Sequence, residues 1–220
     1  MSGPVRDVQL SMIDGMERNV GRIPGSVCVG NNSDLMAYVA PLYLTGSVLD
    51  VTYGNGDTAG GWWRVVRPGD FTFHDLALDG VDFRCLPEAD RSVDTVCFDP
   101  PYIPAGGEPT NDVGSQFRQR FGLGWKDGYR SEADLRCLVR DGLTECARVF
   151  DRYLLVKCME FVSSGRFHDM PTDVSLWARE LGLVKHDVIV HHTGHGIGGN
   201  NITEIKRARR AHSYLLVFSR

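Results

Sequence analysis

Short apolar runs of strand character alternate along this chain with segments of helical periodicity, and this alternation limits its fold more than any other feature. We expect strands at 47–53, 71–75, 81–86, 93–99, 153–159, 184–192 and 213–219. We expect helices at 131–152 and 172–183. Such alternation predicts an α/β fold with a seven-stranded, mostly parallel sheet and helices on both faces. The last two strands are joined by a loop too short for a clear crossover helix, so we expect one antiparallel strand.

The length and composition exclude several classes of protein. A chain of 220 residues suits a single domain, 1–220. Its 42% hydrophobic and 24% charged content is ordinary for a soluble globular protein. No apolar run approaches the roughly 20 residues of a membrane span, and the N-terminus lacks the regions of a signal peptide. We therefore expect no membrane contact and a cytoplasmic location.

Cysteine and histidine usage gives no sign of a metal site. None of the six cysteines forms a C-x-x-C pair, and we interpret all six as reduced thiols of a cytoplasmic protein. His191, His192 and His195 are clustered, but no acid or cysteine accompanies them at ligand spacing. We predict a polar loop at these histidines and no bound metal.

A glycine-rich turn follows the first expected strand. Asp50 lies in that strand, and Gly54 and Gly56 allow a tight turn and close approach of a ligand. Asp75 ends the next strand, about 20 residues further on, where dinucleotide-binding folds place a ribose-binding acid. A plain turn with a capping aspartate is the alternative. Ala59 stands where a third glycine would be, which disfavours a nicotinamide site.

The expected strand at 93–99 ends in Asp99, Pro100, Pro101 and Tyr102. Prolines cannot donate to a sheet ladder, so the strand must stop there. An aspartate followed by proline is also a common way to start a turn. The tyrosine that follows, together with the glycine turn about 45 residues upstream, favours a binding site at the carboxyl edge of the sheet.

Together these motifs resemble those of a known enzyme family. VLDVTYGNG (48–56), VDFRCLP (81–87) and DTVCFDPPY (94–102) are similar to motifs I, III and IV of the amino-group DNA methyltransferases, which modify N6 of adenine or N4 of cytosine. RRAHSYLLVF (209–218) resembles the segment that ends their catalytic domains. The resemblance covers about residues 26–220. It implies a Rossmann-like class I methyltransferase fold and S-adenosylmethionine as methyl donor.

The resemblance also implies where the donor binds. Residues of the first motif would approach its methionine end, Asp75 would accept hydrogen bonds from its ribose hydroxyls, and Asp82 would meet its adenine. The implied cofactor-binding residues are Asp50, Tyr53, Gly54, Gly56, Asp75 and Asp82. Tyr53 departs from the phenylalanine that is usual in the family.

The acceptor residues have a chemical reason to stand together. The exocyclic amine of adenine is a poor nucleophile because its lone pair is delocalised into the ring. The Asp99 carboxylate and the Pro100 carbonyl, aimed by a backbone that Pro100 and Pro101 restrict, would accept its two N–H groups as preorganised electrostatics. Tyr102 would stack on the base, which must be flipped out or single-stranded to be reached. This tetrapeptide favours adenine over cytosine.

Contact with nucleic acid would need local basic patches, because the net charge is −4. Two glycine-rich segments, 103–130 and 193–212, are longer than ordinary loops and are the candidate contact elements. The alternative is ordinary solvated surface. The candidate residues are Arg118, Arg120, Trp125, Lys126, Lys206, Arg207, Arg209 and Arg210. A separate recognition domain has almost no room, so we expect either a short recognition site or help from a second protomer or a partner subunit in selecting the target.

We therefore expect methyl transfer from S-adenosylmethionine to N6 of adenine in DNA. Transfer to N4 of cytosine and transfer to adenine in RNA are the enzymatic alternatives. A catalytically inactive, donor-binding subunit is the non-enzymatic alternative, although such subunits usually lose the acceptor tetrapeptide. A nicotinamide-dependent oxidoreductase shares the fold class, and fold alone does not decide between them.

Overall fold

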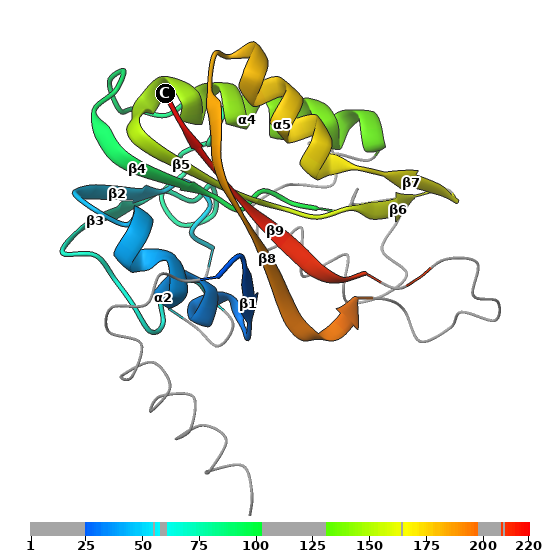
Figure 1. The fold of residues 1–220 in the computed structure, drawn as a ribbon. Coiled ribbons are helices and arrows are strands. Elements are labelled where there is room, and N and C mark those ends of the chain that lie inside the picture. Colours follow the sequence, from blue (N-terminus) through cyan, green and yellow to red (C-terminus); the bar gives the residue numbers. More distant parts are fainter. Residues whose placement is uncertain are drawn as a thin grey trace, which may run out of the picture.

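A seven-stranded sheet forms the centre of the molecule (Figure 1). The computed structural model describes residues 25–54, 56–57, 61–102, 131–163, 165–197, 208 and 210–220. The strands lie in the order β1-β8-β9-β5-β4-β2-β3, and β9 is antiparallel to both of its neighbours while the other pairs are parallel. Their bounds are β1 Val27–Val29, β2 Ser47–Asp50, β3 Asp70–Phe73, β4 Val93–Phe98, β5 Phe150–Cys158, β8 Val184–Ile197 and β9 Arg210–Ser219. This topology confirms the expected Rossmann-like α/β fold with a seven-stranded, mostly parallel sheet and one antiparallel strand.

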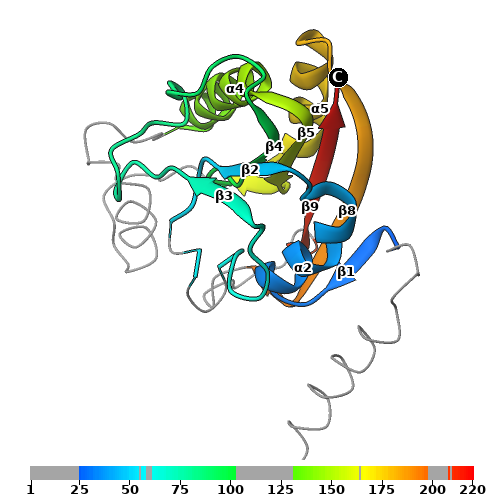
Figure 2. The same cartoon turned by 90° about the vertical axis from the view of Figure 1, so that its left-hand side faces the viewer.

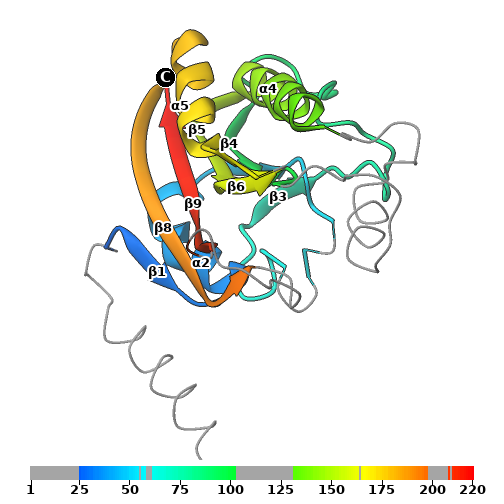
Figure 3. The same cartoon turned by 90° about the vertical axis from the view of Figure 1, so that its right-hand side faces the viewer.

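Helices cover both faces of the sheet, as expected (Figures 1, 2 and 3). Helix α2 (Asn32–Tyr43) packs on one face, and α4 (Glu132–Val149) and α5 (Met170–Glu180) pack on the other. Each strand contributes side chains to the cores on both faces of the sheet, because successive side chains point in opposite directions. Leu154 and Val156 belong to the core under α4 and α5, whereas Leu155 between them belongs to the core under α2.

Local capping explains where the helices begin. At α4, Ser131 and Asp134 form the reciprocal pair of side-chain-to-backbone hydrogen bonds called a capping box. Asn31 and Asp34 do the same at α2. Helix α4 ends at Val149 rather than at 152, because β5 starts at the next residue. Helix α5 covers 170–180 rather than 172–183.

One expected strand is absent. Residues 81–86 form turns rather than a strand, because the Asp82 side chain accepts the backbone N–H of Arg84 and the Asp82 carbonyl accepts that of Cys85. The seventh strand is β1, which lies parallel to β8 at one edge of the sheet, while β3 forms the other edge. It spans three residues with a single buried side chain, Cys28, so its pattern is too short to be recognised in the sequence.

A short antiparallel hairpin, also unexpected, follows β5. It consists of β6 (Phe161–Ser163) and β7 (Arg166–His168). The two long C-terminal strands, β8 and β9, pair antiparallel from Val184 to Ile197. The expected loop at 193–212 is therefore wrong at its ends, since β8 continues to Ile197 and β9 begins at Arg210.

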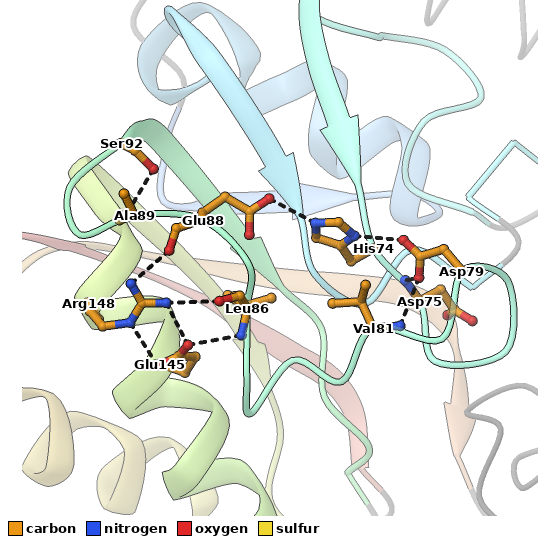
Figure 4. Close-up of polar contacts among 10 residues, drawn as sticks. All are labelled: His74, Asp75, Asp79, Val81, Leu86, Glu88, Ala89, Ser92, Glu145 and Arg148. Atoms are coloured by element: carbon orange, nitrogen blue, oxygen red, sulfur yellow. Dashed lines mark hydrogen bonds and ion pairs between the residues drawn. The ribbon is translucent and has the colours of Figure 1, made fainter.

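The segment between β3 and β4 replaces the expected strand, and side-chain hydrogen bonds fix its position (Figure 4). Arg148 of α4 donates to the carbonyls of Leu86 and Glu88 at 3.1 and 2.7 Å, and Glu145 accepts the Leu86 N–H at 2.9 Å. His74 lies between the carboxylates of Asp79 and Glu88. These bonds tie the segment that carries Asp82 to helix α4.

Close packing between α4 and this segment requires a glycine at 142. A Cβ atom there would lie 2.6 Å from the Phe83 ring and 2.7 Å from the Phe98 ring. We expect Gly142→Leu to lower the free energy of unfolding by about 2–3 kcal/mol, as overpacked cores do. Urea unfolding measures the change, with Gly69→Leu as the matched control, because a Cβ at Gly69 meets nothing within 4 Å. Equal stability of the two variants would contradict this packing.

Candidate active site

A cleft lies at the carboxyl edge of the sheet, beyond β2, β3 and β4. Its walls come from the segments that follow these strands and from helix α4. The lining residues are Val51, Thr52, Asp75, Leu76, Asp82, Phe83, Arg84, Pro101 and Leu138. Three of the residues singled out in the sequence, Asp75, Asp82 and Pro101, thus share one cleft, although 26 positions of sequence separate the first from the last. A lining of mostly apolar side chains together with two carboxylates suits a nucleoside, which has a flat ring and several hydroxyls.

Asp75 fixes the glycine turn after β2. Its Oδ2 accepts the backbone N–H of Gly54 at 2.8 Å, and its Oδ1 accepts that of Ala77 at the same distance. The side chain is 3% exposed. Gly54 has φ of +55°, a left-handed conformation that favours glycine. The glycine turn and the aspartate after the next strand, both assigned to the donor site from the sequence, are therefore in direct contact.

Gly56 and Tyr53 have packing roles in the same turn. A Cβ on Gly56 would lie 2.6 Å from the Tyr53 ring and 2.7 Å from the Trp63 ring, so only glycine fits without movement. The Tyr53 ring is buried and stacks on Phe73 with 4.0 Å between ring centres. Neither residue lines the cleft. Their proposed approach to the donor stays a prediction.

Asp50 is buried behind the cleft and is bonded within the protein. Its Oδ2 accepts the Trp63 indole N–H at 2.6 Å, and its Oδ1 accepts the backbone N–H of Thr52 at 2.8 Å. Burial raises the pKa of Asp50 to about 7, and the nearby charge of Asp99 adds to the rise. Trp63, which the sequence interpretation did not assign to the site, is thus the main side-chain partner of Asp50.

The raised pKa predicts a pH effect that can be isolated with one variant. Because the pKa of Asp50 rises from 3.8 unfolded to about 7 folded, its contribution to stability is fully present below pH 3.8 and is lost as the pH rises through 7. We expect the Tm of the wild type, relative to that of Asp50→Asn, to fall as the pH rises from about 5 to about 8. Thermal unfolding of both proteins measures this difference. Parallel Tm profiles over that range would be the contrary result.

The acceptor tetrapeptide leaves the end of β4 beside this network. The Asp99 N–H donates to Thr52 Oγ1 at 2.7 Å, and the Tyr102 hydroxyl donates to Asp99 Oδ1. Pro100 and Pro101 are buried, and Pro101 reaches the cleft. Of the four residues assigned to the acceptor site, Pro101 therefore lines the cleft that contains Asp75, and Asp99 contacts the cleft residue Thr52.

Lys157 on β5 lies next to the acceptor residues and was not assigned to the site from the sequence. Its side chain is buried, with 4% exposed, and Nζ donates to Asn32 Oδ1 at 2.6 Å. Nζ also lies 5.4 Å from the centre of the Tyr102 ring, within the range of a cation–π contact. The start of helix α2 is thus connected to the acceptor site through one lysine.

Asp82 is held by an arginine that the sequence interpretation passed over. Arg84 Nε lies 3.0 Å from both carboxylate oxygens of Asp82, and Nη2 lies 2.5 Å from Oδ2. This hydrogen bonding lowers the pKa of Asp82. Both residues line the cleft, so its outer end presents a carboxylate and a guanidinium together. The sequence interpretation placed both residues in a strand, so the turn that brings the Arg84 guanidinium onto the Asp82 carboxylate was not expected.

Most of the residues assigned to nucleic acid, seven of the eight, lie outside the described residues. These are Arg118, Arg120, Trp125, Lys126, Lys206, Arg207 and Arg209. Arg210 is described: it begins β9, and its guanidinium carbon lies 5.1 Å from the centre of the Phe167 ring on β7. The role of all eight in binding nucleic acid stays a prediction.

The expected polar loop at the histidines is wrong at all three positions, because β8 extends to Ile197. His191 and His192 belong to β8, and His191 is fully buried with Nε2 2.9 Å from the Gly30 carbonyl oxygen. The side chain of His195 lies outside the described residues. Among the side chains that are described, no group of three or more His, Cys, Asp or Glu could hold a metal ion. In the same part of the chain, no helix is long and apolar enough to cross a membrane.

Comparisons with known proteins give a likeness of fold only. No family model and no curated protein matches the chain. A candidate DNA modification methylase of Thermus thermophilus, solved with S-adenosyl-L-methionine, has a TM-score of 0.39 and 15% identity over 79% of this chain and 55% of that one. The chain thus spans about half the length of that protein.

Two shorter structures are similar over nearly their whole length. A candidate methyltransferase of Bacillus halodurans has a TM-score of 0.45 and 11% identity over 84% of this chain and 97% of that one. An S-adenosylmethionine-dependent methyltransferase of Thermotoga maritima has a TM-score of 0.44 and 14% identity over 96% of this chain and 97% of that one. Likenesses this weak carry no weight for function, so any functional conclusion depends on the residues of the site.

Proposed function

We propose that the protein transfers a methyl group from S-adenosylmethionine to N6 of adenine in DNA. One observation carries the proposal: the tetrapeptide Asp99 to Tyr102 leaves β4 beside a cleft lined by Asp75 and Asp82. This brings the implied acceptor and donor groups to the same edge of the sheet, where ligands of open α/β folds bind.

The cleft has the chemistry that the donor needs. Leu76, Phe83 and Leu138 offer apolar contact to an adenine ring, Asp75 offers acceptors to ribose hydroxyls, and Asp82 offers a carboxylate to the exocyclic amine of the donor's adenine. Each Asp75 oxygen already accepts one backbone N–H and keeps a second lone pair for a hydroxyl. The donor supplies a methyl group activated by the positive charge on its sulfur.

The chain's own groups prepare the acceptor. The amine would donate one N–H to the Asp99 carboxylate and the other to the Pro100 carbonyl, so that its lone pair points toward the methyl group. The bond from nitrogen to the methyl carbon would form as the carbon–sulfur bond breaks, S-adenosylhomocysteine would leave as the neutral thioether, and the nitrogen would then lose one proton to solvent water. The Tyr102 hydroxyl holds Asp99 Oδ1, and its ring is the candidate stacking surface for the base.

DNA is the proposed substrate. We also propose that a second protomer or a partner subunit helps to select the target sequence. N4 of cytosine and adenine in RNA remain the alternatives, because their amines offer the same two N–H groups to the same acceptors. We place the enzyme in the cytoplasm, where DNA and the methyl donor are both accessible.

Mass spectrometry of nucleosides tests the proposal. DNA and RNA are analysed from cells that express the wild type or Asp99→Ala, alongside cells without either. We expect N6-methyladenine in DNA that appears with the wild type and is missing with the variant. N4-methylcytosine or a mark in RNA would replace the proposed substrate with one of the alternatives. No mark in either nucleic acid, from a folded protein that binds the donor, would favour the inactive donor-binding subunit instead.

A further inference from the structure

Thr52 is the link between the buried donor-side aspartate and the acceptor aspartate. Its Oγ1 accepts the backbone N–H of Asp99 at 2.7 Å and lies 3.3 Å from Asp50 Oδ1, to which it donates. Its own backbone N–H also donates to Asp50 Oδ1, at 2.8 Å. Thr52 and Asp50 are 7% and 3% exposed. The hydroxyl therefore has one defined orientation, because it has a single hydrogen and one carboxylate to receive it.

The sequence after β4 makes this hydrogen bond unusually important for the acceptor site. Pro100 and Pro101 have no backbone N–H, so the Asp99 N–H is the last main-chain donor before Tyr102. Neither proline can donate a hydrogen bond to a strand ladder. The acceptor of this last donor is a side-chain hydroxyl from another strand's end rather than a backbone carbonyl.

The far end of the network is equally anchored. Asp50 Oδ2 accepts the Trp63 indole N–H at 2.6 Å, and the Trp63 ring is buried in the core under α2. A continuous path of hydrogen bonds thus runs from a core tryptophan through Asp50 and Thr52 to the backbone of Asp99. Buried networks of this kind hold their members rigidly when each is satisfied.

We propose that Thr52 is a positioning residue for methyl transfer, which holds the Asp99 backbone so that the carboxylate and the Pro100 carbonyl face the target amine. The catalytic part of this inference rests on the proposed function. Its structural part, that Thr52 holds the Asp99 backbone, is independent of that function. Thr52 contacts Asp99 through the main chain, so its loss changes where the carboxylate lies rather than removing it. Thr52 also lines the cleft, so direct contact with the donor is the competing role. The donor Kd separates that role from the positioning of Asp99.

Two substitutions separate the hydroxyl from the shape of the side chain. Thr52→Val keeps the volume and removes the hydroxyl, whereas Thr52→Ser keeps the hydroxyl. We expect amide exchange at Asp99, followed by NMR, to be about tenfold faster in Thr52→Val and near the wild-type rate in Thr52→Ser. We expect kcat to fall about tenfold in Thr52→Val, with the donor Kd changed by less than about threefold, and Thr52→Ser to restore kcat.

Several results would overturn the proposal. They are an unchanged exchange rate or kcat in Thr52→Val, a Thr52→Ser protein as impaired as Thr52→Val, or a large rise in donor Kd with kcat preserved. If Thr52→Val does not fold, Thr52→Ala removes the same hydroxyl without placing a methyl group near Asp50. If the wild type transfers no methyl group, both the proposed function and the catalytic role of Thr52 are wrong. The amide exchange rates of Asp99 then still show whether the Thr52 hydroxyl holds its backbone.

Discussion

Asp99→Ala is expected to lower kcat for methyl transfer by about 10²–10³-fold, the usual cost of losing one preorganised electrostatic group in an active site. The carboxylate is one of the two proposed acceptors for the amine, and Tyr102 loses its hydrogen-bond partner with it. Donor binding should change little, because Asp99 does not line the cleft. Methyl transfer from labelled donor to an adenine-containing oligonucleotide measures kcat, and calorimetry measures the donor Kd.

Asp94→Ala is the matched control for this experiment. Asp94 lies near the amino end of β4, and its carboxylate accepts the backbone and hydroxyl hydrogens of Ser47. Its loss should lower Tm and leave kcat per folded molecule close to that of the wild type. Should Asp99→Ala retain most of the wild-type kcat, the assignment of the acceptor site to the end of β4 would be wrong.

Asp75→Ala is expected to raise the donor Kd by about 100-fold, because hydrogen bonds to a charged group contribute about 1.5–3 kcal/mol and this carboxylate serves two purposes. It offers acceptors to the ribose hydroxyls, and it holds the Gly54 N–H and the Ala77 N–H. Without it the glycine turn loses its tie to the end of β3, so the donor site is lost in shape as well as in charge. Calorimetric titration with S-adenosylmethionine measures the change.

The same strand provides the control. Asp70 begins β3 and is exposed, at the end of the strand opposite the cleft. Asp70→Ala removes an equal charge and should leave the donor Kd within about twofold, since screening is nearly complete beyond about 10 Å at ordinary ionic strength. A donor Kd for Asp75→Ala that matches the Asp70→Ala value would exclude Asp75 from the donor site.

Much of the architecture could be predicted because it depends on local patterns. The strands β2, β4, β5 and β9 follow from short apolar runs, the helices α4 and α5 follow from helical periodicity, and the α4 start follows from the Ser131–Asp134 capping box. The expected strand at 81–86 failed because Asp82 forms a turn with its own neighbours, which competes with strand pairing. The strand β1 was missed because its stability comes from pairing with β8, 163 positions away at Val27 and Val190.

By itself, the sequence determined the residue types that carry the chemistry and the strand ends that bear them. Asp75 and the tetrapeptide from Asp99 were recognisable because they follow expected strands in combination with the glycine turn after β2, although each of them alone would also suit an ordinary turn. Only the tertiary structure decided which groups meet: Thr52 with Asp99, Trp63 with Asp50, and Lys157 with Tyr102. A hydrogen bond depends on where two atoms lie, and strand order, which no local pattern encodes, brings these partners within reach of one another.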